Sequence, residues 1–345
     1  MKTHSQFCSL LSLSLTLLFL PHQGGAAEQT LPHPEDTPGA RGDAAFELGD
    51  YDTATEEYQK LLSSAPDLAA YQRAAELLWV KGDQRKARLV MQKAIDTGGT
   101  ATTNLVADAK ARLAMMLMDG GSLMPAEQLV RQALAETPDN ASLLLASARF
   151  AIAHKDYTNA LAILEKVVAN QPDHESLVAL GDLYSVIGRG DDADKTYERL
   201  LSMHLKESSG KTYMLNGGQK LARFYADHDR NLDQAMALAQ AAYGMSKSVA
   251  IADTLAWCQY KKGLHVEARK TIRQALRWKT PDAAMLFHAG MIYAKLQDRP
   301  TARQYLYRAL SLNPHWHPTE PQLAADQLDE LSHEAQTASL ATINP

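Results

Sequence analysis

Residues 253–276 read DTLAWCQYKKGLHVEARKTIRQAL, and four small residues stand in this stretch at regular places. They are separated by seven, five and seven residues and are Ala256, Gly263, Ala268 and Ala275. The same spacing recurs thirty-four residues further on, at Gly290, Gln297, Ala302 and Ala309. A pattern that returns at a fixed offset predicts a structural repeat.

Eight such sets follow one another along the chain. The third slot of every set holds alanine, at Ala54, Ala87, Ala126, Ala160, Ala193, Ala235, Ala268 and Ala302. This spacing predicts two antiparallel helices per unit: a small first residue permits close packing, and glycine in the second slot ends the first helix. Proline cannot continue a helix, so the second helices should end before Pro66, Pro138, Pro172 and Pro314. One hairpin cannot bury its own apolar face, and neighbouring units must therefore stack.

These units resemble tetratricopeptide repeats. The family pattern is clearest in GDYDTATEEYQKLLSSAP (49–66), ALGDLYSVIGRGDDADKTYERLL (179–201) and HAGMIYAKLQDRPTARQYLYRALSLNP (288–314). The resemblance covers residues 35–316. It implies an all-α, right-handed superhelical solenoid of about eight antiparallel hairpins. An amphipathic segment at 317–336 should form a C-terminal capping helix, residues 28–34 a flexible leader and residues 337–345 a flexible tail.

Residues 1–27 have the layout of a secretory signal peptide. Lys2 precedes a mostly apolar run from Phe7 to Leu20, and small residues at 25–27 offer a cleavage site near Ala27. The apolar run is short for a membrane span, although an uncleaved anchor is the alternative. The sequence therefore predicts a periplasmic or secreted protein.

Two insertions interrupt the repeat spacing, near residues 97–106 and 203–216. The first has the composition of a loop. The second either extends a helix or forms a longer loop. Tolerated surface insertions are one interpretation; the other is that they border a binding groove or mark a bend in the array.

The sequence holds no catalytic motif of the familiar classes. Acidic pairs in the turns are better explained as helix caps or solvated groups, and the run His315-Trp316-His317 has no supporting ligand cluster. After cleavage Cys258 would be the one cysteine, interpreted as a small buried hydrophobe, with a reactive thiol as the alternative. We therefore expect a non-enzymatic protein with no metal and no cofactor.

The resemblance implies a concave inner face lined by the first helices. Carried over onto this sequence, the partner-binding residues would be Trp79, Met115, Met118, Arg149, Arg223, Trp257, Tyr260, Phe287 and Met291. The corresponding positions Phe46, Glu76 and Asp182 belong to the same face. Aromatic and methionine side chains with a few charges suit a peptide or protein segment. The alternative for each apolar residue is packing between helices. A carboxylate clamp is not expected, because Gly39 and Asp43 occupy its places in the first unit.

Charge is unevenly distributed. Residues 28–79 hold eleven acidic and three basic residues, whereas residues 254–310 hold eleven basic and three acidic. A stacked rod would therefore be acidic at one end and basic at the other. The arginines proposed for electrostatic docking are Arg269, Arg273, Arg277, Arg299 and Arg303. Solvated helix faces are the alternative, and docking of an acidic partner or self-association is the sharper hypothesis.

The function predicted from sequence is an interaction scaffold or adaptor in the cell envelope that binds a protein or peptide in its concave groove. One alternative is an assembly factor for an envelope system, in a membrane-associated complex serving cytochrome maturation, pilus or outer-membrane assembly. Another is a small-ligand-binding protein or enzyme with a site between repeats. Nucleic acid is not an expected partner, because the overall charge is negative.

Overall fold

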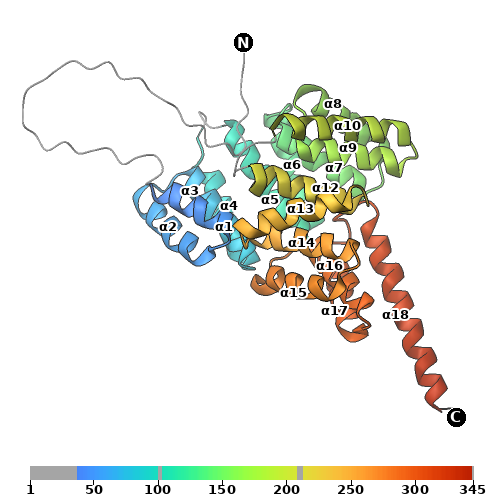
Figure 1. Cartoon of the computed structure of the whole chain (residues 1–345). Coiled ribbons are helices and arrows are strands. Elements are labelled where there is room, and N and C mark those ends of the chain that lie inside the picture. The colour runs from blue at the N-terminus through green and yellow to red at the C-terminus, as the bar shows by residue number, and fades with distance from the viewer. Residues whose placement is uncertain (1–36, 100–102, 208–212, 344–345) are drawn as a thin grey trace, which may run out of the picture.

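The computed structural model describes residues 37–99, 103–207 and 213–343, with side chains as far as residue 332. The predicted signal peptide and leader lie outside the described residues. The described part consists of helices that follow one another in antiparallel pairs (Figure 1). No helix within these ranges combines the length and the apolar composition that crossing a membrane requires.

The described residues form eight helical hairpins, as the repeat spacing predicts. The first helices of the hairpins are α1 (Pro38–Leu48), α3 (Leu68–Val80), α5 (Thr103–Asp119), α7 (Ala141–Ala153), α9 (His174–Val186), α12 (Gln219–Asp227), α14 (Val249–Lys261) and α16 (Ala283–Lys295). The second helices are α2 (Tyr51–Ser64), α4 (Gln84–Thr97), α6 (Leu123–Glu136), α8 (Tyr157–Asn170), α10 (Gly190–Glu207), α13 (Leu232–Met245), α15 (His265–Ala275) and α17 (Arg299–Leu312). A π-helical turn, η3 (Met214–Gly218), precedes α12, and a 3₁₀ turn, η4 (Leu276–Trp278), follows α15.

Aspartate side chains cap the first turn of seven of the sixteen hairpin helices. The carboxylates of Asp50, Asp83, Asp156 and Asp298 accept hydrogen bonds from backbone amides in the first turn of a second helix. Asp67, Asp173 and Asp282 do the same for first helices. Such caps satisfy amides that have no partner inside the helix.

The small residue in the first helix of each hairpin allows the second helix to approach closely. A methyl group on Gly181 would lie 2.3 Å from the Tyr197 ring, and one on Gly290 would lie 2.5 Å from the Leu306 side chain. Tyr197 and Leu306 are both buried. The predicted reason for the small residue, close helix packing, is therefore confirmed at these two hairpins.

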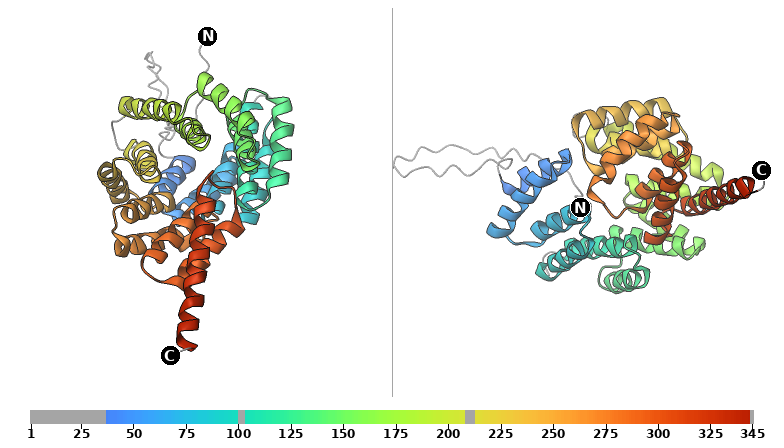
Figure 2. Two further views of the ribbon diagram at one scale, coloured as in Figure 1. Left: turned by 90° about the vertical axis from the view of Figure 1, so that its right-hand side faces the viewer. Right: turned by 90° about the horizontal axis from the view of Figure 1, so that it is seen from below.

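The two ends of the array lie together, which the sequence did not predict. The hairpins follow one another around a central axis, so that the first ones come to lie beside α13, α14 and α15 (Figures 1 and 2). One buried apolar cluster contains Tyr51 and Leu77 together with Val249 and Ile272. The expectation of a rod with separated acidic and basic ends is wrong, because the curvature of the solenoid brings those ends into contact.

We call this contact the seam. At its first level, the amide of Lys247 donates to the carbonyl of Leu48 at 3.0 Å, and the amide of Val249 donates to the Tyr51 hydroxyl at 3.0 Å. At the second level, the Thr280 hydroxyl donates to the carbonyl of Val80 at 2.5 Å. At each level a turn from an early hairpin meets the end of a second helix from a late hairpin.

A third level joins α5 to the end of α17. The amide group of Asn313 donates to the carboxylate of Asp119 at 3.2 Å, and Asn313 is 2% exposed. Burial raises the pKa of Asp119 to about 6, against the opposing charge of Arg149. The seam thus continues over three successive early hairpins.

The last helix, α18 (Glu320–Ile343), begins later and ends later than predicted. Residues 317–319 lie in a turn before it, and residues 337–343 of the expected flexible tail are helical. The insertion near 203 lengthens α10, which reaches Glu207. Residues 100–102 and 208–212, the centres of both insertions, lie outside the described residues.

Candidate functional site

A cluster of ion pairs joins first helices of three consecutive hairpins, with Arg223 of α12 at its centre. Its Nε donates to both carboxylate oxygens of Asp227, at 2.9 and 2.8 Å. Its Nη1 donates to Asp253 of α14 at 2.8 Å. The Arg223 and Asp227 side chains are 25% and 23% exposed, whereas Asp253 is 5% exposed. The cluster is therefore partly accessible to solvent on the side of α12 and buried on the side of α14.

The geometry fixes the protonation of His288 on α16, which is completely buried. Nη2 of Arg223 lies 3.1 Å from its Nε2, and a guanidinium can only donate, so Nε2 accepts. The proton consequently lies on Nδ1, which donates to Asp253 at 2.8 Å. Trp257 stacks on the imidazole, with ring centroids 4.1 Å apart. His288 is thus a neutral link between the arginine and the aspartate.

Asp182 of α9 forms a second centre. Its carboxylate accepts from the Tyr197 hydroxyl at 2.7 Å and from Nε2 of His228 at 2.7 Å. Nδ1 of His228 donates to the carbonyl of Phe224 at 2.8 Å. Both ring nitrogens therefore face acceptors. Burial opposes protonation, but Asp182 and this carbonyl raise the pKa of His228 above its ordinary value. Burial also acts against ionisation of Asp182, yet His228 and His317 hold its pKa well below the usual range.

The segment 313–320, which we call the strap, crosses between distant first helices. It is tied to α5 through Asn313 and Asp119. Nε2 of His317 lies 3.7 Å from the Asp182 carboxylate on α9. The Trp316 ring packs against Phe287 of α16 at 5.8 Å. The strap therefore links the third, fifth and eighth hairpins, and a segment doing so must cross the inside of the curved array.

Glu320, the last residue of the strap, enters the cluster around Arg223. It is 8% exposed, and its Oε2 accepts from Nε1 of Trp316 at 2.6 Å. One ligand atom each of Asp227, His288 and Glu320 lies within 4.8 Å of the others, a grouping that could hold a metal ion. Arg223 already donates to Asp227 and His288, however, and its positive charge occupies the place that a cation would need.

The predicted partner-binding residues divide by exposure. Trp79, Met118, Trp257 and Phe287 are buried; Met115, Arg223, Tyr260 and Met291 are half-buried; Arg149 is exposed. For the four buried residues, burial supports the alternative of packing between helices, because their side chains are covered by neighbouring hairpins and, for Phe287, by Trp316 of the strap. Whether any of the nine binds a partner stays a prediction.

Sequence reasoning found Arg223 but missed Asp253, His288 and Glu320. In α14 and α16, Asp253 and His288 each stand among apolar side chains, in VAIADTLAWCQYK and AAMLFHAGMIYAK. An isolated polar residue in an apolar first helix was therefore the available signal, since buried polar groups need partners. Nothing local to Glu320 indicates that it reaches the same cluster.

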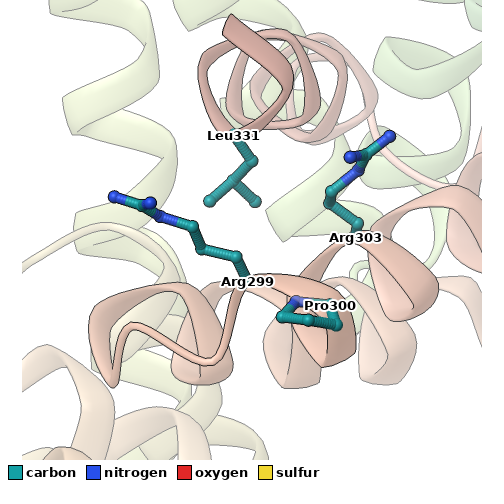
Figure 3. Close-up of a pocket in the computed structure, with 4 residues that line it drawn as sticks. All are labelled: Arg299, Pro300, Arg303 and Leu331. Carbon is teal, nitrogen blue, oxygen red and sulfur yellow. The ribbon is translucent and has the colours of Figure 1, made fainter. Parts of the chain in front are cut away.

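The five arginines predicted for electrostatic docking also differ in their surroundings. Arg269, Arg273 and Arg303 are exposed on second helices. Arg277 is exposed as well, but it serves the seam, where its Nη2 donates to the carbonyl of Gly49 at 3.2 Å. Arg299 and Arg303 of α17, with Pro300, face Leu331 of α18 across a cavity of about 470 Å³ (Figure 3).

Cys258 lies in the core beside the Arg223 cluster. It is completely buried, and burial raises the pKa of its thiol to about 12. Thiolate is the reactive form of cysteine. The interpretation as a small buried hydrophobe is supported over that of a reactive thiol.

Family comparisons agree with this geometry. Three family models described as tetratricopeptide repeat match residues 40–102, 117–180, 151–210 and 283–315, which together span more than half of the chain. The chain belongs to the tetratricopeptide repeat family. No curated protein matches its sequence. The family's fold is that of a protein–protein interaction scaffold, and its members are in general non-enzymatic.

Several solved structures are similar to this tetratricopeptide repeat protein. A chain of the APC/C hetero-tetramer Cut9–Hcn1 is 15% identical with a TM-score of 0.46, over 85% of this chain and 55% of that one. A tetratricopeptide repeat protein from Parabacteroides merdae is 16% identical with a TM-score of 0.43, over 80% and 98%. PilF of Pseudomonas aeruginosa is 17% identical with a TM-score of 0.34, over 77% and 97%. This chain thus spans little more than half of the first of these proteins.

Proposed function

We propose that this tetratricopeptide repeat protein is a non-enzymatic adaptor of the cell envelope, which binds a peptide or protein segment along its concave face. The observation that carries the proposal is the inner wall formed by α12, α14 and α16. It combines a partly exposed guanidinium, Arg223, with half-buried apolar side chains at Tyr260 and Met291. Such a wall offers both an anchor for charge and apolar contact area to one extended segment.

Site-specific crosslinking in the native host tests the binding face. A photo-crosslinking amino acid is placed at Tyr260 or at Met291, and in the control at Tyr307, which lies on α17 and is 67% exposed. We expect the same partner to be captured at both inner positions and not at Tyr307. Capture at Tyr307 alone, by protein that remains folded, would contradict binding on the concave face.

The envelope location rests on the signal-peptide layout of residues 1–27, which lie outside the described residues. N-terminal sequencing of the protein isolated from the host tests it. We expect a mature chain that begins close to residue 28. A chain that retains Met1 and fractionates with cytoplasmic proteins would refute this part of the proposal.

A second candidate is electrostatic docking of an acidic partner on the outer face. Arg269 and Arg273 are exposed one turn apart on α15, and neither has an acidic partner among the described ion pairs. Reversing both charges to glutamate should slow association with a captured partner about tenfold at low salt, since steering by charge acts on the rate of encounter. An unchanged association rate would contradict docking at Arg269 and Arg273 and would leave the concave face as the proposed binding site.

A further inference from the structure

The strap occupies the same inner wall that the proposed function assigns to a partner. Trp316 covers Phe287, and Glu320 enters the cluster around Arg223. The pKa of Glu320 is lowered despite burial, and the charges of His317 and Arg223 contribute to this. The wall is therefore complementary to an aromatic ring followed four residues later by a carboxylate, and the chain itself supplies both.

The strap also makes an unfavourable contact with the first helices, between two carboxylates. The carboxylates of Glu320 and Asp227 offer oxygen atoms within 4.8 Å of each other, and Arg223 donates to Asp227 from the same helix, α12. Burial and the charge of Glu320 raise the pKa of Asp227 above its ordinary value. Like charges at this distance repel, most strongly in a partly desolvated recess. Repulsion of this kind weakens the hold on the strap.

We propose that the strap is an internal ligand that a partner displaces. The partner is a protein segment with an aromatic residue and, four positions later, an acidic residue, matching Trp316 and Glu320. This inference rests on the proposed function, because it identifies the chemistry of the segment that the concave face binds. An internal segment competes at a high effective concentration, so the wild-type chain binds such a segment weakly until the strap leaves.

The test uses a fluorescent peptide of residues 312–322, LNPHWHPTEPQ, and the full mature chain. Its affinity is measured by anisotropy for wild type and for the variant Trp316→Ala/Glu320→Gln, which weakens the strap. We expect the variant to bind the peptide at least about tenfold more tightly than wild type, since its own segment no longer competes. A peptide carrying the same two substitutions is the matched control and should not bind.

A second variant protects the test against misfolding. His317→Ala removes the contact with Asp182 from a side chain that is 30% exposed, and it should also tighten peptide binding. Circular dichroism confirms that each variant is folded. Equal affinity of wild type and a folded variant for the peptide, or equal binding of the control peptide, overturns the inference. If crosslinks at Tyr260 and Met291 still form in that case, the proposed function stands and only the internal ligand is refuted.

Discussion

At the slot between the two helices of a hairpin, glycine and non-glycine residues adopt one backbone conformation. Gly49, Gly82, Gly121, Gly188 and Gly263 have φ between 77° and 83°. Lys155 and Gln297 fill the same slot with φ of 61°. Side chains other than glycine are strained in this left-handed region. The hairpin geometry therefore imposes the conformation even where the sequence does not favour it.

Replacing Gln297 by glycine should stabilise the protein. The gain is about 0.5–1 kcal/mol, the strain removed less the extra entropy that glycine loses on folding. Chemical denaturation of Gln297→Gly and wild type measures it. The opposite change, Gly188→Ala, should cost about 1 kcal/mol from strain alone, because no atom lies within 4 Å of the added methyl group. A neutral or destabilising Gln297→Gly would show that its side chain has a compensating contact.

At the scale of the helix pair, the small residue of the first helix decides how closely the second can pack. Gly290 faces the Leu306 side chain across the last hairpin, and a methyl group there would approach to 2.5 Å. Gly244, near the end of α13, has no neighbour within 4 Å of such a group. The same substitution should therefore have opposite effects at the two positions.

Gly290→Ala should destabilise the protein by about 1–3 kcal/mol, because overpacking against Leu306 exceeds the gain in helix propensity. Gly244→Ala should stabilise it by up to about 1 kcal/mol through helix propensity alone. Denaturation midpoints of the two variants provide the measurement. Equal effects of the two substitutions would mean that α16 and α17 can move apart at Gly290 without loss of stability.

The fifth hairpin contains a histidine pair that predicts sensitivity to acid. Nδ1 of His174 lies 2.8 Å from Nε2 of His204, so one ring donates and the other accepts. Burial, with a contribution from His204, lowers the pKa of His174 to about 4. Between pH 6.5 and 4 the unfolded chain binds a proton at this site and the folded chain does not, so stability falls as the pH decreases through this window.

Melting temperatures measured from pH 7 to pH 4 test this sign. The decrease for wild type should be steeper than for His174→Gln, in which the titrating group is absent. Comparison of the two slopes removes the contribution of other groups, because these are common to both proteins. Parallel slopes of melting temperature against pH would show that the histidine pair binds one further proton without loss of stability.

For the whole molecule, the seam turns an open solenoid into a closed one. Contacts across it join residues 199 apart, as between the Ser246 hydroxyl and the carbonyl of Glu47. A methyl group on Gly82 would lie 2.6 Å from the carbonyl oxygen of Trp278 and 2.9 Å from that of Lys279. Gly188 has the same left-handed backbone but no such neighbour. Gly82 and Gly188 therefore share the backbone conformation and differ in the neighbouring atoms, so that Gly188 serves as the control for Gly82.

Gly82→Ala should cost about 1–3 kcal/mol more than Gly188→Ala, because rigid backbone atoms of the opposite turn must move in addition to the shared strain. Denaturation gives the free energies, and small-angle scattering gives the radius of gyration. We expect expansion for Gly82→Ala and none for Gly188→Ala. Identical losses without expansion would show that the seam contributes little to the closed shape.

The sequence by itself determined the hairpins. Alanine, glycine and proline at fixed spacing act through local geometry: close packing at Gly181, a left-handed turn at Gly263, and a second helix that ends before Pro314. These effects extend over fewer than thirty residues, so a single unit carries them. Arg223 was found through the resemblance to the family, which implies that its position in the first helix belongs to the inner face.

The tertiary structure alone decided which side chains the inner face leaves open. Trp257 and Tyr260 stand in one helix at similar repeat positions, yet Trp257 is buried under His288 and Tyr260 is half-buried. The seam and the strap depend on the small rotation between hairpins summed over the whole array, and no local pattern records that sum. The contacts of Asn313 with Asp119 and of Glu320 with the Arg223 cluster exist because the solenoid closes on itself.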